Sequence, residues 1–499
     1  SVRTGAGVGL HTVYELGVEI AARRHRDSRS AEAARIAFEM AEINRAIGLR
    51  ETLGEFDQIR DRLAPEYWET LKRLSNAENL LFRTQSEAAK AQVRRLRLRL
   101  TEHEIAAGLA VPATARFRSP PVTTRNVQGA LGPSEALFSF HLGPRDTQVW
   151  AISREKLEMH CIGSTARLGP RIAEFRRAFA GSSPDEAAAL GAVLYRLLFG
   201  GVSEEILRKP DWLLLVDGVL FELPFAALVE SRPNEKPAYL VERHSLRLLP
   251  GAAMLLAGGG ETWRGPMLAL GDAIYNRADV RWQAPEPERV LGRLWRPRTA
   301  RGVEMARLAG SARELERAAA SYRAGGAPPI LLAGPQATVR AFQEALAWEP
   351  SVLHLATHVV PSADNPAVGQ IAMSLGPEGA PELLGMDDIS ALRARPQLVV
   401  MTGCSSGGGE LLAGEGLWGL TRAWLRAGAR CVTVTFWPVT DHSGELLQTF
   451  YRQLGGAGPG GFAVRPERAL QLAQKEMIWS GNWRSRPAHW AAFFVVSRN

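Results

Sequence analysis

Short apolar runs that alternate with helical segments constrain the fold of this chain more than any other feature. Helices expected near 310–323, 337–347, 414–427, 441–454 and 464–479 separate the later runs. This strand–helix rhythm predicts an α/β fold with a mostly parallel sheet that helices cover on both faces. The apolar runs are Trp212–Val216, Met267–Gly271, Ile330–Ala333, Val352–Ala356, Leu398–Met401 and Cys431–Thr435.

A hairpin and two helices are expected before these runs. Ala136–Leu142 and Gln148–Ile152 flank a Gly-Pro-Arg-Asp turn, a pattern typical of a β-hairpin. Residues 166–180 and 185–199 then follow as helices.

Residues 10 to about 110 have helical periodicity throughout. Ala34, Ala37, Phe38 and Ala41 fall on one face at the spacing of a helix. Small alanines let helices cross closely, so we expect antiparallel hairpins of the tetratricopeptide kind. The period is too irregular to count repeats.

A proline-rich break separates the helical part from the α/β part. Pro112, Pro120 and Pro121 disfavour a helix and predict a linker. We therefore expect a helical region over residues 1–115, a linker over 116–126 and an α/β domain over 127–499.

The composition excludes several classes of protein. Hydrophobic residues make up 46% of the chain and charged residues 22%, as in ordinary globular proteins. No run reaches the roughly 18 uncharged apolar residues of a membrane span, and the N-terminus lacks the pattern of a signal peptide. The N-terminus also lacks an initiator Met, which is consistent with a fragment.

The cysteines and the charge give two further expectations. Cys161, Cys404 and Cys431 are too scattered for a disulfide framework or a zinc site, so we expect a reducing, cytoplasmic location and no metal. The net charge of +8 comes mostly from arginine. We favour solvated helix faces over nucleic-acid contact, because no aromatic stacking platform accompanies the basic residues.

Two expected strand ends carry reactive side chains. Val352–Ala356 is followed by Thr357 and His358, and Leu398–Met401 leads to Cys404 within a glycine-rich segment. Sites in open parallel sheets form beyond the carboxyl ends of the strands, so neighbouring strands would bring His358 and Cys404 together. An imidazole beside a thiol activates it as a nucleophile, and glycines leave backbone amides available to an oxyanion. No lysine follows the glycines at Walker spacing, so we expect no nucleotide or other cofactor.

The chain resembles the CHAT domain family, caspase-like proteins that often follow tetratricopeptide repeats. The resemblance runs from about residue 127 to 499 and implies the caspase-like α/β fold and peptide-bond hydrolysis by His358 and Cys404. The Gly403–Gly407 motif is also similar to that of separases. The motifs are Leu213–Leu228, His354–His358, Gly403–Gly407, Gly414–Leu420, Phe436–Asp441 and Pro487–Val496.

The oxyanion hole implied by this resemblance is formed by the backbone amides of Cys404 and of the residue after the histidine. The family usually has glycine at that second position, whereas this chain has Val359. The change keeps the amide but removes the freedom of glycine at positive φ, so either the loop is rearranged or the resting state is not fully competent.

Three residues are candidates for a specificity pocket. Metacaspase-like relatives place an acid two residues before the cysteine, where this chain has Thr402. Separases supply one after the last core strand, where this chain offers Asp441 and Glu445, and Glu445 is the better positional match. An acidic pocket would select Arg or Lys before the cut. The alternative is that Asp441 caps a helix and Glu445 lies on its solvated face.

These expectations give one leading interpretation and two alternatives. The leading interpretation is an endopeptidase that cleaves specific protein partners through a thioacyl-enzyme and is regulated by its helices or by a protein bound to them. The resemblance further implies a link to bacterial defence or cell-death modules. The alternatives are a catalytically silent CHAT scaffold, which Val359 keeps open but the intact His358 and Cys404 pair argues against, and a nucleic-acid-binding module, which charge alone would support.

Overall fold

The structure is a computed structural model. It describes residues 2–59, 66–67, 69–70, 73–74, 87–106, 122–180, 184–231, 237–257, 262–282, 305–322, 327–362, 369–376, 379–392, 394–402, 415–437, 439, 444–455, 457–458 and 461–498. The chain forms two compact units. The first comprises Ser1–Gly260 and the terminal Val496–Asn499, and the second comprises Glu261–Ser362 and Pro366–Val495.

The first unit contains a five-stranded mixed sheet in the order β3-β2-β1-β4-β7. Strands β1, β2 and β3 pair antiparallel, while β1–β4 and β4–β7 pair parallel. The strands are β1 (Glu135–Leu142), β2 (Asp146–Ile152), β3 (Leu157–Ser164), β4 (Asp211–Leu215) and β7 (Ser245–Leu248), beside a ribbon of β5 (Val229–Glu230) and β6 (Ala238–Tyr239). The helices are α1 (Val2–Ser28), α2 (Ala31–Ile59), α4 (Glu87–Ala106), α5 (Thr124–Ala130), α6 (Leu168–Ala180), α7 (Pro184–Phe199), α8 (Glu204–Leu207), α9 (Leu240–Arg243) and α10 (Ala252–Leu256).

Both faces of this sheet are buried, because successive side chains of a strand point to opposite faces. Phe138 of β1 packs on Phe199 of α7, with ring centroids 5.2 Å apart. The next residue on either side faces the other way, and Leu137 belongs to a buried cluster with Phe38 of α2 and Trp150 of β2.

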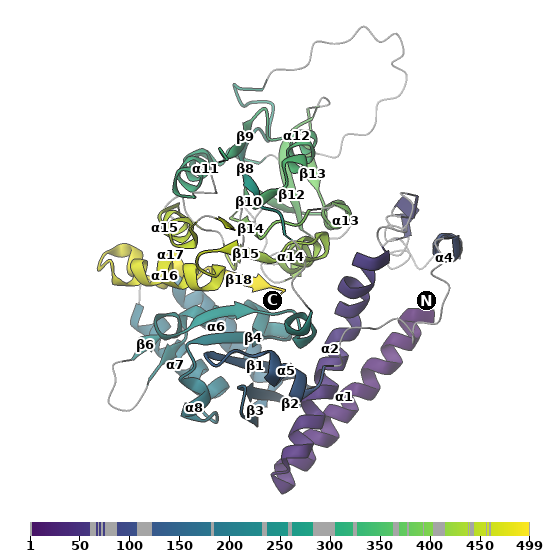
Figure 1. The fold of residues 1–499 in the computed structure, drawn as a ribbon, viewed down its shortest axis with the longest axis vertical. Coiled ribbons are helices and arrows are strands. Elements are labelled where there is room, and N and C mark those ends of the chain that lie inside the picture. Colours follow the sequence, from purple (N-terminus) through teal and green to yellow (C-terminus); the bar gives the residue numbers. More distant parts are fainter. Residues whose placement is uncertain are drawn as a thin grey trace. The chain divides into compact units, whose positions relative to one another are not determined.

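Helices α1 and α2 form an antiparallel hairpin of the predicted tetratricopeptide kind (Figure 1). Buried alanines of α2, including Ala34 and Ala37, contribute to the core of the first unit. The Trp150 Nε1–H donates to the carbonyl oxygen of Ala34 over 3.0 Å. The hairpin therefore completes the hydrophobic core of the first unit and does not form a core of its own.

The second unit contains the parallel part of the fold, with strands in the order β18-β15-β14-β10-β8-β9. Parallel pairing is recorded for β8–β9, β8–β10, β10–β14 and β14–β15. These strands are β8 (Gly265–Ala273), β9 (Ile330–Gly334), β10 (Pro350–Ala356), β14 (Leu398–Met401), β15 (Cys431–Thr435) and β18 (Phe493–Ser497, its first three residues in this unit). A separate antiparallel sheet contains β11 (Val359–Pro361), β12 (Gly369–Leu375) and β13 (Pro381–Leu384), and β16 (Ala457–Gly458) pairs with β17 (Gly461–Phe462).

Helices cover the sheet of the second unit on both faces, as predicted. In Figure 1, α11 and α15 lie on one side of β8, β10, β14 and β15, while α12, α13 and α14 lie on the other. The helices are α11 (Ala309–Ser321), α12 (Val339–Ala345), α13 (Met386–Ala391), α14 (Glu415–Ala427), α15 (Gly444–Leu454), α16 (Pro466–Trp479) and α17 (Pro487–Trp490). The α/β class with an N-terminal helical region is thus confirmed.

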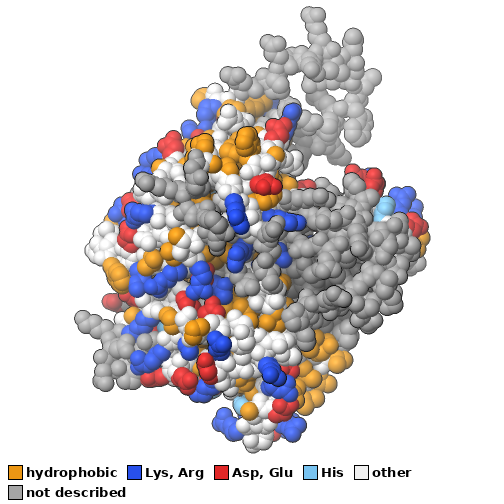
Figure 2. Space-filling view, in the orientation of Figure 1, with side chains coloured by type: hydrophobic (Ala, Val, Ile, Leu, Met, Phe, Trp, Pro, Cys, Tyr) orange, Lys and Arg blue, Asp and Glu red, His pale blue; other side chains and the backbone are white. Residues whose placement is uncertain are grey.

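The surface is mixed in character. Figure 2 shows Lys and Arg side chains on the visible face interspersed with acidic and apolar ones, without one continuous basic area among the coloured residues. Within the described ranges, no helix combines the length and the apolar character needed to cross a membrane.

Candidate active site

The two strands that carry the predicted reactive residues are neighbours. Strand β10 pairs parallel with β14, and Leu355 lies opposite Met401 near the carboxyl ends of both strands. His358 follows β10 after one intervening residue, and β14 leads through Thr402 to the segment that contains Cys404. Cys404 itself lies outside the described residues.

His358 is buried, with 1% of its surface exposed, and its ring has a defined hydrogen bond. Nε2 lies 2.7 Å from the carbonyl oxygen of Ala306. A carbonyl oxygen only accepts, so Nε2 carries the proton in the neutral ring and Nδ1 is the basic nitrogen. The ring also packs on Tyr275 with centroids 4.6 Å apart, and the His358 backbone N–H donates to the Tyr275 hydroxyl over 3.4 Å.

Burial determines the protonation states of His358 and Tyr275. It lowers the pKa of His358 below its ordinary value, and the bond to Ala306 only partly opposes that shift. Burial also raises the pKa of the Tyr275 hydroxyl, so Tyr275 stays neutral. His358 is therefore a neutral imidazole at pH 7, which is the form that can accept a proton.

The carbonyl that orients His358 belongs to a segment held at two points. Arg307 donates Nε–H to Asp272 Oδ1 over 2.8 Å and Nη2–H to Oδ2 over 3.0 Å. On the other side of Ala306, the side-chain amide of Asn276 donates to the Met305 carbonyl over 3.0 Å. Asp272 has a φ of 46° at the end of β8, and its carboxylate also pairs with Arg281 over 2.6 Å. These contacts fix the position of the acceptor carbonyl.

Val359 occupies the position where the family usually has glycine. It is the first residue of β11, is 4% exposed and lies opposite Ile371 in the antiparallel sheet. Its φ is not positive: in the described part of the chain, the non-glycine residues with positive φ are Arg29, Asp272 and Glu349. The extended backbone at this position therefore accommodates a β-branched residue without strain.

A buried polar network connects the two strands that lead to the predicted reactive residues. Glu314 of α11 accepts hydrogen bonds at Oε1 from the Thr402 hydroxyl over 2.5 Å and from His354 Nε2–H over 3.0 Å. His354 is fully buried, and its Nδ1 lies 2.6 Å from the hydroxyl of Tyr451. Burial raises the pKa of Tyr451, so its hydroxyl stays neutral beside His354. His354 thus points inward, and Thr402 is engaged with Glu314.

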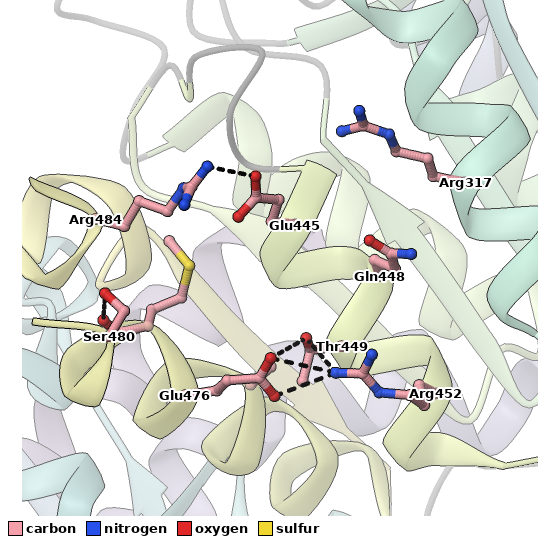
Figure 3. A pocket seen from close by; sticks show the side chains of 10 residues that line it. Arg317, Glu445, Gln448, Thr449, Arg452, Glu476, Ser480 and Arg484 are labelled. Atoms are coloured by element: carbon pink, nitrogen blue, oxygen red, sulfur yellow. Dashed lines mark hydrogen bonds and ion pairs between the residues drawn. The ribbon is translucent and has the colours of Figure 1, made fainter. Parts of the chain in front are cut away.

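The three candidates for the specificity pocket lie in different settings. Glu445, in the first turn of α15, lines a polar pocket and forms an ion pair with Arg484 over 2.5 Å (Figure 3). Thr402 is buried. Asp441 lies outside the described residues. The charge of Glu445 is already balanced by a guanidinium in this structure.

Several residues of the site were not predicted from the sequence. Asp272 follows the apolar run Met267–Gly271 directly. It could have been predicted in the same way as His358, because both lie at the carboxyl end of an expected strand. Ala306 contributes a backbone carbonyl, which no side-chain pattern marks. Glu314 and Tyr275 contact the site residues only because the fold brings together segments that are distant in sequence. Among the described residues, no group of three or more His, Cys, Asp and Glu side chains is arranged to hold a metal ion.

The chain is similar to several known proteins. The chain is similar to tetratricopeptide repeat protein 28 of Homo sapiens, with 27% identity over 318 residues, and of Mus musculus, with 28% over 323 residues. Each match covers 58% of this chain and 12% of the relative, so the chain spans about an eighth of the length of these curated relatives. The crystal structure of the Saccharomyces cerevisiae separase–securin complex matches with 9% identity and a TM-score of 0.47, over 93% of this chain and 34% of that chain.

A family model described as the CHAT domain matches residues 188–499. This match includes both strands of the candidate site and the segments that follow them. It covers more than half of the chain, and the resemblance found in the motifs is therefore confirmed: the chain belongs to the CHAT domain family.

Proposed function

We propose that this chain is a cysteine endopeptidase in which His358 activates Cys404. The observation that carries the proposal is the hydrogen bond from His358 Nε2–H to the Ala306 carbonyl. It fixes the tautomer of the neutral ring, with Nδ1 as the proton acceptor, and burial lowers the pKa of a ring that lies next to the strand leading to Cys404. An imidazole held in one tautomer and one orientation is what a thiol nucleophile requires.

The proposed reaction proceeds in two stages. The Cys404 thiol gives its proton to His358 Nδ1, and the thiolate attacks the carbonyl carbon of the scissile peptide bond. The resulting oxyanion accepts hydrogen bonds from the backbone amides of Val359 and Cys404. His358 then protonates the departing amine, and a thioacyl-enzyme forms. Water, deprotonated by His358, attacks this thioester and releases the acid and the free thiol.

The substrate class follows from the same proposal. The partners would be proteins with a cleavable segment, and a regulatory protein would bind the N-terminal helices. Glu445 would select Arg or Lys before the scissile bond only if that substrate residue replaced Arg484 as the partner of its carboxylate.

The proposal also includes the domain division at residues 115 and 127, a cytoplasmic location and a role in bacterial defence or cell death.

Covalent labelling tests the proposal. The protein is incubated with an irreversible peptidyl inhibitor directed at cysteine, and mass spectrometry locates the adduct. Cys161 is an exposed thiol and Cys431 a buried one, so the chain contains its own comparators. We expect the adduct on Cys404 in preference to Cys161, because activation and not exposure alone determines thiol reactivity.

Two variants give the controls. His358→Ala should abolish the labelling of Cys404 and leave any slow labelling of Cys161 unchanged. Cys404→Ala should remove the preferred adduct and leave only any slow labelling of Cys161. Preferential labelling of Cys161 in the unchanged protein would instead favour a catalytically silent scaffold.

A further inference from the structure

A polar cavity of about 540 Å³ lies among α11, α15, α16 and the segment after α16 (Figure 3). Arg317 comes from α11, while Glu445 and Gln448 come from α15. The complete lining is Arg317, Glu445, Gln448, Thr449, Arg452, Ala473, Glu476, Met477, Ser480 and Arg484. A volume of this size admits several side chains of a ligand.

Both carboxylates of the cavity already have cationic partners. Glu445 pairs with Arg484 over 2.5 Å. Glu476 accepts from Arg452 over 3.2 Å and from the Thr449 hydroxyl over 3.1 Å. The negative charges of the cavity are therefore balanced before any ligand enters.

Arg317 is the third arginine of the cavity, and among the described residues it makes no ion pair. Figure 3 shows its guanidinium pointing into the cavity without a bond to the other residues drawn. Its Nη1 lies 3.6 Å from the position that a Cβ on Gly444 would take, which places it beside the first residue of α15. The exposed amide of Gln448 lies on the same helix. An unpaired cation next to a helix N-terminus attracts negative charge.

Two exposed tryptophans lie close in sequence to lining residues of the cavity, at the end of α16 and just after it. The Arg484 guanidinium lies 5.0 Å from the ring centre of Trp483, which is 42% exposed. Trp479 precedes the lining residue Ser480 and is 64% exposed. Exposed tryptophan beside arginine is typical of the residues that contribute most to the binding energy of protein interfaces.

We propose that this cavity and its two tryptophans form a docking site for an acidic segment of a partner protein. An acidic side chain of the partner would enter the cavity to meet Arg317, and neighbouring apolar side chains would pack on Trp479 and Trp483. A polypeptide satisfies both contacts, whereas a small inorganic anion satisfies only the first. This site goes beyond the proposed protease function, because binding there does not require Cys404 to react.

Fluorescence anisotropy with a labelled peptide of alternating glutamate and leucine tests the proposal on the full chain. Arg317→Glu is compared with Arg340→Glu, which reverses the same charge on α12 at a side chain that is 87% exposed. We expect Arg317→Glu to weaken binding about tenfold or more and Arg340→Glu by less than about twofold. Trp479→Ala should weaken binding several-fold, and a peptide with lysine in place of glutamate should bind at least about tenfold more weakly, because it would have to displace Arg484 from Glu445.

Three results would overturn the proposal. The first is that the unchanged protein does not bind the acidic peptide. The second is that both arginine variants weaken binding equally, which would indicate attraction to the net positive charge alone. The third is that inorganic phosphate displaces the peptide and Trp479→Ala has no effect on peptide binding, which would indicate a small-anion site. Labelling of Cys404 is unaffected by these outcomes, so failure of this site and failure of the proposed protease function are distinguishable.

Discussion

Thr402, at the end of β14, donates its hydroxyl hydrogen to Glu314 of α11 over 2.5 Å. Glu314 accepts a second bond from His354, four residues before His358 on the neighbouring strand. One carboxylate therefore connects the strand that leads to Cys404 with the strand that leads to His358. We expect it to hold the two loops in register.

Replacing Glu314 should affect both stability and the reactive loops. In Glu314→Ala the buried Thr402 hydroxyl and the His354 N–H lose their acceptor, and we expect a loss of about 2–3 kcal/mol in the free energy of unfolding. Urea denaturation measures this loss. The rate of Cys404 labelling should also fall, since the loops lose their common anchor.

Glu316 provides the matched control on the same helix, because its side chain is exposed. Glu316→Ala should change the unfolding free energy by no more than about 0.5 kcal/mol. Glu314→Gln keeps one acceptor oxygen and should lose less than Glu314→Ala. Equal effects of Glu314→Ala and Glu316→Ala would contradict the proposed role of Glu314.

The buried His358 predicts a dependence of stability on pH. Its pKa is lowered in the folded state, so below the ordinary value of 6.5 the unfolded chain binds a proton that the folded chain resists. The contribution of His358 to stability is therefore fully present above pH 6.5 and is lost as the pH falls toward the folded-state pKa. Urea denaturation at several pH values measures this slope.

His358→Gln keeps a donor for the Ala306 carbonyl and removes the titration. Stability of this variant should fall less steeply as the pH drops below 6.5 than stability of the unchanged protein. Identical slopes would show that His358 titrates in the folded chain as it does in the unfolded chain.

Val359→Gly restores the residue that the family usually has after the histidine. Because Val359 is buried and its backbone does not need positive φ, we expect no gain in the rate of Cys404 labelling. We also expect a loss of about 2–3 kcal/mol in the free energy of unfolding, from lost burial and the entropy of glycine. A faster labelling rate in the glycine variant would instead show that valine holds the site in an incompetent state.

Much of the parallel sheet could be predicted from the sequence. Strands Leu398–Met401 and Cys431–Thr435 have the predicted bounds, because each is a short apolar run with helices on either side. The β11–β13 sheet was not predicted. Strand β11 contains only three residues, one of them a proline, and its pairing with β12 depends on contacts that local pattern does not encode.

The candidate site could likewise be predicted only in part from the sequence. The positions of His358 and of Thr402 at adjacent strand ends follow from the rhythm of apolar runs. The role of Glu314 does not, since it lies in an Arg-Glu-Leu-Glu stretch that has the pattern of a solvated helix face. Its inward contacts arise from the packing of α11 on β8 and β10, which is a tertiary effect.

The docking of the N-terminal hairpin rests on a buried ion pair in α2. Glu42 is 1% exposed and pairs with Arg45. Glu42 also accepts from the backbone N–H of Ala252 over 2.7 Å and from the Ser139 hydroxyl over 3.1 Å, while Arg45 donates to the Phe140 carbonyl. The pair thus attaches α2 to both β1 and α10.

Glu42→Ala should release this attachment. It leaves the Arg45 guanidinium buried without its carboxylate, and breaking a buried pair in this way costs about 3–5 kcal/mol. Trypsin should then cleave faster within the hairpin, beginning in α1, where Arg23 and Arg24 are exposed, as followed by mass spectrometry. Glu32→Ala is the control, because Glu32 pairs with Arg35 at a side chain that is 59% exposed, where solvent screens the pair. If the hairpin regulates the site, the rate of Cys404 labelling changes in Glu42→Ala and stays the same in Glu32→Ala. Equal resistance of both variants to trypsin would mean that apolar packing around Phe38 and Trp150 holds the hairpin without help from the ion pair.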